Sequence, residues 1–126
     1  MPRIVASEDC GNSPKNAFVE KLSIALALGD SAVVLEAVSE DIRWDRIGKP
    51  PLQGKEALAL ALGQVASQPL DDLVILHAIS HGRDGAVNGT IKLRNGGKRA
   101  FCHVIEFSSA KGASVRLITS YFVDTA

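Results

Sequence analysis

The sequence predicts a single α+β domain in which a curved antiparallel sheet is covered on one face by three helices. Two observations support this fold class. Residues 14–67 carry apolar side chains at helical spacing, interrupted by a short strand-like segment over residues 41–47. From residue 73 onward, apolar and polar residues alternate in four segments, which are separated by short glycine-containing turns.

Capping residues place the helices in the first half of the chain. Ser13 followed by Pro14 is a favourable helix start, because a serine hydroxyl caps free backbone N–H groups and proline fits the first turn. Gly29 is expected to end this helix, and Asp30 to cap a second, shorter one. The third helix is rich in alanine and leucine and is expected over residues 54–67.

The second half of the chain predicts four long strands. The turns between them are of hairpin length, so the strands are expected to be consecutive and antiparallel. Long antiparallel strands twist and curl, and their concave face must be covered. Helices over such a face can leave an apolar cavity with one open end. The four segments are residues 73–81, 86–94, 99–108 and 114–123.

Length and composition indicate one globular domain. A chain of 126 residues can bury a substantial core without disulfides or metals. Residues 1–13 show no periodic pattern and are expected to form a flexible leader. Residues 14–126 are expected to form the domain.

The charges and cysteines argue against several classes of protein. Lys+Arg and Asp+Glu number 14 each, whereas nucleic-acid binding usually needs an excess of basic residues. No apolar run is long enough to span a bilayer, and the first residues lack the apolar core of a signal peptide, so we expect a cytoplasmic protein with no membrane partner. Cys10 and Cys102 have neither a disulfide framework nor metal-ligand spacing. We therefore expect no metal and no cofactor.

One motif connects the expected strand over residues 41–47 to the third helix. Asp45, Gly48, Pro51 and Gly54 follow one another at intervals of three residues. With the order of the elements, this motif resembles the nuclear transport factor 2-like superfamily. That group has a cone-shaped, cystatin-like fold and includes ketosteroid isomerases, SnoaL-type polyketide cyclases, scytalone dehydratases and limonene-epoxide hydrolases. The resemblance covers about residues 14–123 and implies the fold more strongly than the function.

The resemblance implies a catalytic pair. Asp45 takes the position of the general base of ketosteroid isomerases, and His103 the position of their second acid. Leu22 stands where those enzymes have an oxyanion tyrosine, which argues against steroid isomerisation because the loss of one oxyanion donor costs about 10²–10³ in rate. An Asp facing a His still suits acid–base catalysis, as in the cyclases and dehydratases. The expected reaction is an isomerisation, cyclisation or dehydration of a small hydrophobic carbonyl compound.

The orientation of Asp45 has two interpretations. Strand alternation puts Asp45 and Trp44 on opposite faces. The motif favours Asp45 in the pocket, whereas hydrophobicity favours Ile42 and Trp44 inside. A slip of one residue or a bulge would exchange the two faces.

The other expected ligand-binding residues are large side chains on faces that should point inward. Two histidines four apart on one strand lie about 13 Å apart, which is too far to chelate one metal ion. His81 adjoins a turn and is expected to be exposed, so only His77 is included as a pocket residue. The expected ligand-binding set is Trp44, His77, Phe101, Ile118 and Phe122.

An alternative function belongs to a different class. The missing tyrosine and the inward Trp44 also fit a non-catalytic module that binds a small ligand or mediates dimerisation. On the last strand, Leu117, Thr119 and Tyr121 are expected to face outward as a partly apolar row. A homodimer formed through the sheet would cover that row.

Overall fold

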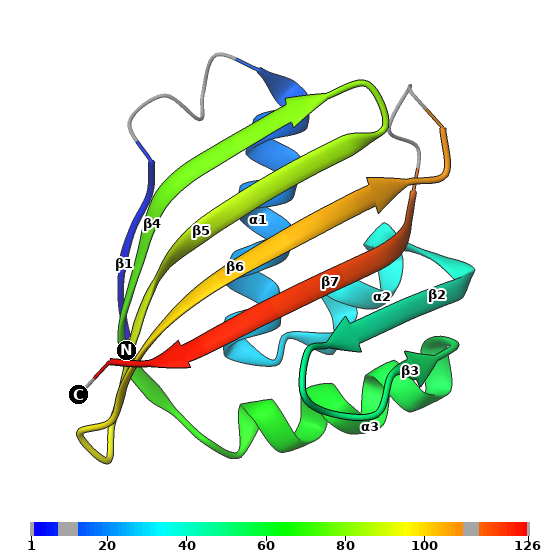
Figure 1. Cartoon of the computed structure of the whole chain (residues 1–126). Coiled ribbons are helices and arrows are strands. Elements are labelled where there is room, and N and C mark those ends of the chain that lie inside the picture. Colours follow the sequence, from blue (N-terminus) through cyan, green and yellow to red (C-terminus); the bar gives the residue numbers. More distant parts are fainter. Residues whose placement is uncertain (1, 8–12, 110–113, 126) are drawn as a thin grey trace.

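The structure is a computed structural model, and it describes residues 2–7, 13–109 and 114–125 (Figure 1). The helices of this part are α1 (Pro14–Leu28), α2 (Ser31–Ala37) and α3 (Lys55–Ala66). The strands are β1 (Arg3–Val5), β2 (Val38–Arg46), β3 (Leu52–Gln53), β4 (Leu70–His81), β5 (Asp84–Leu93), β6 (Lys98–Phe107) and β7 (Val115–Asp124). The predicted fold class, an α+β domain with a curved sheet and three helices, is confirmed.

The helix starts form as the sequence predicts. The Ser13 hydroxyl accepts a hydrogen bond of 3.3 Å from the backbone N–H of Asn16, and Asp30 Oδ1 accepts one of 3.3 Å from Val33. Gly29 ends α1 with a φ of 71°. A Cβ at this glycine would lie 2.5 Å from the backbone nitrogen of Ala66, so the end of α1 packs closely on the end of α3.

The sheet has seven strands in the order β1-β4-β5-β6-β7-β2-β3. β4 to β7 pair consecutively and antiparallel, as the hairpin turns predict. β2 pairs in parallel with β7, so residues from the middle of the chain lie beside its last strand. β2 begins at Val38, three residues before the predicted strand, because Val38 is already extended and buried opposite Val115.

The start of the chain differs from the expected flexible leader. Residues Arg3–Val5 form β1, which pairs in parallel with β4, and Arg3 forms an ion pair of 3.0 Å with Asp72. A strand of three residues is too short to give a periodic signal in the sequence. The part of the expected leader at residues 8–12 lies outside the described residues.

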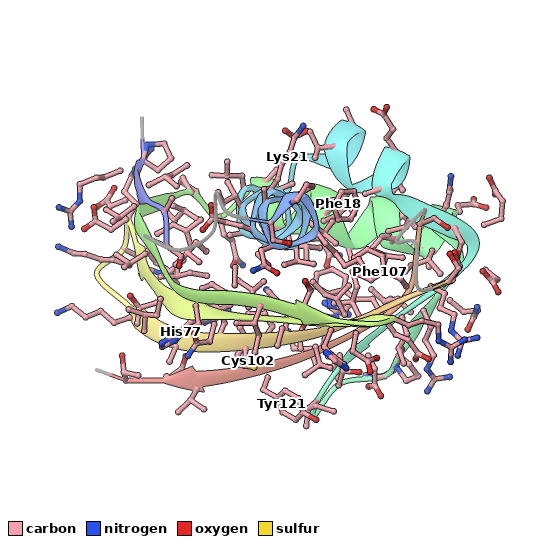
Figure 2. The ribbon with its side chains drawn as sticks, turned by 90° about the horizontal axis from the view of Figure 1, so that it is seen from above. Phe18, Lys21, His77, Cys102, Phe107 and Tyr121 are labelled. Atoms are coloured by element: carbon pink, nitrogen blue, oxygen red, sulfur yellow. The ribbon has the colours of Figure 1, made fainter. Side chains whose placement is uncertain are left out.

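The helices cover one face of the sheet and leave the other without helices. Figure 2 shows Phe18 and Phe107 between α1 and the sheet, where their ring centroids are 5.7 Å apart. It also shows His77, Cys102 and Tyr121 on the face that points away from the helices. Of the helices in the described segments, none is long and apolar enough to cross a membrane.

Candidate functional site

A cavity of about 80 Å³ lies between the inner face of the sheet and the helices. Its walls are mostly apolar and come from α1, from the end of α3 and from the inner face of the sheet. The aliphatic lining residues are Leu26, Ala27, Val65, Leu70, Ile91 and Leu93. Two aromatic residues, Trp44 and Phe122, and three polar ones, Gln68, Arg99 and His103, complete the lining.

A chain of buried hydrogen bonds joins two of the lining residues through a serine. The indole nitrogen Nε1 of Trp44 donates to Ser120 Oγ over 2.8 Å, and Nδ1 of His103 lies 2.6 Å from the same oxygen. All three side chains are almost completely buried. Ser120 is the direct cross-strand partner of His103, and the parallel pairing of β2 with β7 brings Trp44 to the same place.

Ser120 fixes which nitrogen of His103 can serve a ligand. The serine oxygen receives the Trp44 N–H and can either donate its own hydrogen to Nδ1 or accept one from it. The bond to Nδ1 leaves Nε2 as the nitrogen for which no partner exists in the described part of the chain. Nε2 can thus present a donor or an acceptor, depending on the tautomer.

Burial keeps His103 neutral. Desolvation lowers the pKa of His103 from the ordinary 6.5 to about 4, since water is removed from the charged form of the ring. The rings of Phe101 and Phe122 lie 5.0 Å and 5.9 Å from the imidazole, measured between centroids. The described lining of the cavity contains no carboxylate that would offset this effect. At neutral pH, His103 is therefore a hydrogen-bonding group and not a cation.

A larger groove of about 340 Å³ adjoins the cavity. Five residues line both spaces: Trp44, Val65, Gln68, Arg99 and Phe122. The groove adds further polar side chains, and among them are Arg46, Lys49 and Gln64. The cavity and the groove, which share these walls, form one candidate site with an apolar part and a polar part.

Asp45 does not line this cavity. The inner face of β2 is taken by Ile42 and Trp44, which are buried, and Asp45 lies on the opposite face, half-buried beside Thr119 of β7. The motif spacing is present, but the hydrophobic residues decide which face of the strand points inward. The expected pairing of Asp45 with His103 across a pocket is thus not formed, and a catalytic role for Asp45 stays a prediction.

The other predicted site residues are divided between the lining of the cavity, the core and the outer face of the sheet. Trp44, His103 and Phe122 line the cavity. Phe101 and Ile118 are buried in the core without lining it, and Phe101 packs against the His103 ring.

His77 lies outside the cavity. It is exposed on the outer face of the sheet, where its Nδ1 lies 2.9 Å from Oδ1 of Asn88 (Figure 2). The register of β4 shifts between Ile75 and His77, so the two residues do not share a face as strict alternation predicts. A bulge of this kind leaves no clear sign in the sequence.

Sequence reasoning missed two residues of the site. Ser120 lies among the residues of the last strand that are predicted to face inward, but a single small polar residue gives no signal of a hydrogen-bonding role. Arg99 is the second residue of β6 and alternates in step with Phe101 and His103, which could have identified it as inward-facing.

Within the ranges that the structure covers, no three His, Cys, Asp or Glu side chains come together in a way that could hold a metal ion. The groups that the site offers to a ligand are hydrogen-bonding side chains, apolar walls and positively charged side chains.

Comparisons with known proteins identify the fold of this chain through solved structures. No protein-family model and no curated protein matches the chain. A solved NTF2-like protein of unknown function from Cytophaga hutchinsonii is similar, with a TM-score of 0.70 and 16% identity over 86% of this chain and 99% of the other. Another from Burkholderia pseudomallei has a TM-score of 0.70 and 20% identity over 88% of this chain and 92% of the other.

An enzyme is also among the similar structures. An LEH-like epoxide hydrolase from M. tuberculosis has a TM-score of 0.68 and 20% identity, over 86% of this chain and 82% of the other. Sequence identities this low support a shared fold and no shared chemistry. The resemblance noted in the sequence is confirmed at this level: the chain has the nuclear transport factor 2-like fold.

Proposed function

We propose that this protein binds a small, mostly apolar molecule in the cavity and holds one polar group of that molecule with Nε2 of His103. The observation that carries the proposal is the buried chain from Trp44 through Ser120 to His103. The chain orients a neutral imidazole at the wall of an otherwise apolar cavity. Pockets with apolar walls and a few oriented polar groups are typical of small-molecule sites.

The same geometry favours binding over proton transfer. A general base works best when its pKa is near the working pH, and burial lowers the pKa of His103 to about 4. A carboxylate beside the ring would raise that pKa, but the described lining of the cavity has none. A neutral, oriented hydrogen-bonding group is what remains, and it suits recognition of a carbonyl, hydroxyl or amide.

The fluorescence of Trp44, the only tryptophan, tests this proposal. We would titrate the protein with a panel of small apolar ketones, alcohols, amides and epoxides. Ala27 lines the cavity, so Ala27→Leu should fill it and abolish the response. The matched control is Ala17→Leu on the exposed side of the same helix. If no compound gives a saturable response, or if both variants respond like the wild type, the proposal is wrong.

A catalytic function is the second candidate. It is favoured by the place of His103, whose ring can donate or accept a hydrogen bond, in an apolar cavity. In this version, His103 carries out acid–base chemistry on a small hydrophobic carbonyl compound, and Asp45, which lies on the other face of β2, is tested beside it as the acid that the sequence motif implies. The test is turnover of the panel compounds by the wild type, His103→Ala and Asp45→Asn. Turnover that both variants retain would exclude these roles.

We also propose that a second copy of the chain covers the outer face of the sheet. Several large apolar side chains are exposed on that face, and they are Ile79, Val104, Tyr121 and Val123. Their exposed fractions range from 42% for Val104 to 62% for Val123. Large apolar side chains gathered on one face of a sheet are typical of an interface, and a symmetric dimer is the simplest way to bury them.

A further inference from the structure

Two arginines stack on aromatic rings that line the candidate site. The guanidinium carbon of Arg46 lies 5.3 Å from the centre of the Trp44 ring, and that of Arg99 lies 5.3 Å from the centre of the Phe122 ring. Both aromatic rings line the cavity as well as the groove, and both arginines line the groove. Stacking on an aromatic face holds a guanidinium group in place.

Each guanidinium group has an N–H that makes no hydrogen bond within the described residues. Nε of Arg46 and Nε of Arg99 are buried and have no hydrogen-bond partner among the residues that the structure places. Arg46 forms no ion pair within the same residues, whereas Nε of Arg99 lies 3.6 Å from Oδ1 of Asp124, which is an ion pair beyond hydrogen-bond distance. The side chain of Asp124 is 84% exposed, so this pair is open to solvent and weak. Buried donors without partners call for an explanation, and a ligand acceptor is one.

The charge of the groove is mostly positive. Its lining holds three basic side chains, Arg46, Lys49 and Arg99, and one acidic side chain, Asp124. The whole chain has a formal net charge of zero, so the positive charge is a local feature of this groove. Low-dielectric walls beside such a cluster concentrate its field and attract anions.

We infer that the ligand of this site is a small organic acid, whose carboxylate binds Arg46 and Arg99 in the groove while its short apolar body enters the cavity toward His103. The inference rests on the proposed binding function and adds the chemical class of the ligand. A planar guanidinium fork matches a carboxylate in shape and charge. The apolar body is required because the inner cavity, of about 80 Å³, has mostly aliphatic and aromatic walls.

A pair of probes of the same shape isolates the charge. Cyclohexanecarboxylate and cyclohexanecarboxamide differ in charge and hardly in size, so binding of each is measured by calorimetry at neutral pH. The acid should bind about tenfold more tightly than the amide, and this preference should shrink as salt is added. Arg46→Met and Arg99→Met should each bring the ratio of the affinities for acid and amide close to one.

Lys92→Met is the matched control, because it removes one positive charge from an exposed position outside the cavity and the groove. It should keep the preference for the acid. If an arginine variant binds neither probe, Arg46→Lys and Arg99→Lys replace it. These keep the charge, lose the planar fork and should show an intermediate preference.

Each other result overturns the inference. Equal affinity of the wild type for acid and amide would refute the anionic ligand and leave the proposed binding function intact. A loss of preference in Lys92→Met as large as in the arginine variants would show an effect of total charge and not of this groove. Failure of both probes to bind the wild type would reject the inference for this class of ligand, and the neutral panel would then decide the proposed function separately.

Discussion

Trp44 and His103, which are far apart in the sequence, share one hydroxyl group. Ser120 Oγ lies 2.8 Å from the indole nitrogen of Trp44 and 2.6 Å from Nδ1 of His103. The three residues come from β2, β6 and β7, so the arrangement depends on the parallel pairing of β2 with β7. This relationship sets the orientation of the imidazole and is the basis of the functional proposal.

Removal of that hydroxyl should destabilise the fold. Ser120→Ala leaves the buried Trp44 Nε1 without its acceptor and His103 Nδ1 without its partner, and an unsatisfied buried group costs about 1–3 kcal/mol. The measurement is the free energy of unfolding in denaturant. Ser108→Ala, which removes an exposed hydroxyl near the end of β6, should change it by less than about 0.5 kcal/mol. Equal stabilities of the two variants would contradict the role of Ser120.

Acid should destabilise the protein through His103. Because burial lowers the pKa of His103 to about 4, the unfolded chain binds a proton at this residue before the folded chain does as the pH falls. The corresponding stability is complete above about pH 6.5 and is lost as the pH falls toward 4, by about 3 kcal/mol in total.

The variant His103→Gln tests this pH dependence. Its free energy of unfolding should vary less between pH 6.5 and 4 than that of the wild type. His77→Gln, which changes an exposed histidine on the outer face, should keep the wild-type slope. A wild-type profile that is flat in this range would show that His103 is not a buried neutral group.

Two glycines should respond in opposite ways to alanine. A Cβ at Gly89 would overlap the carbonyl oxygen of Val74 and press on the ring of Phe101, so Gly89→Ala should destabilise by about 1–3 kcal/mol. Gly63 lies exposed in α3 with open space around it, so Gly63→Ala should stabilise by about 0.5–1 kcal/mol. Thermal unfolding of both variants measures the two changes in stability. A stabilising Gly89→Ala would mean that the sheet leaves more space at Gly89 than described.

The outer face of the sheet should mediate dimerisation. Sedimentation of the wild type is expected to show a dimer, and Val104→Glu should give a monomer because it places a charge among the apolar side chains of that face. Leu60→Glu is the matched control, since Leu60 is 71% exposed on α3 at the helical side. A monomeric wild type, or a dimer that only Leu60→Glu disrupts, would contradict this interface.

Most of the fold could be predicted from the sequence because it depends on local patterns. Helical spacing, capping residues and hairpin turns each mark their element within a few residues. β1 could not be predicted this way, since its three residues acquire their conformation only by pairing with β4. The parallel pairing of β2 with β7 likewise depends on contacts between distant segments that no local pattern reports.

The site was predicted only in part, because the orientation of a side chain on a strand depends on parity. His103 and Phe122 lie on strands whose alternation is unbroken around them, and both line the cavity as predicted. Asp45 does not line the cavity, because Trp44 occupies the inner face of its strand. His77 does not line it either, because a bulge precedes His77 in β4. Motif spacing alone could not decide either case.

The most direct test of the central claim is a crystal structure of the wild-type protein with the tightest-binding compound of the fluorescence panel. We predict that the compound occupies the cavity between Trp44, His103 and Phe122, with a polar atom within hydrogen-bond distance of His103 Nε2. A compound bound elsewhere on the protein, with the cavity filled only by water, would contradict the claim.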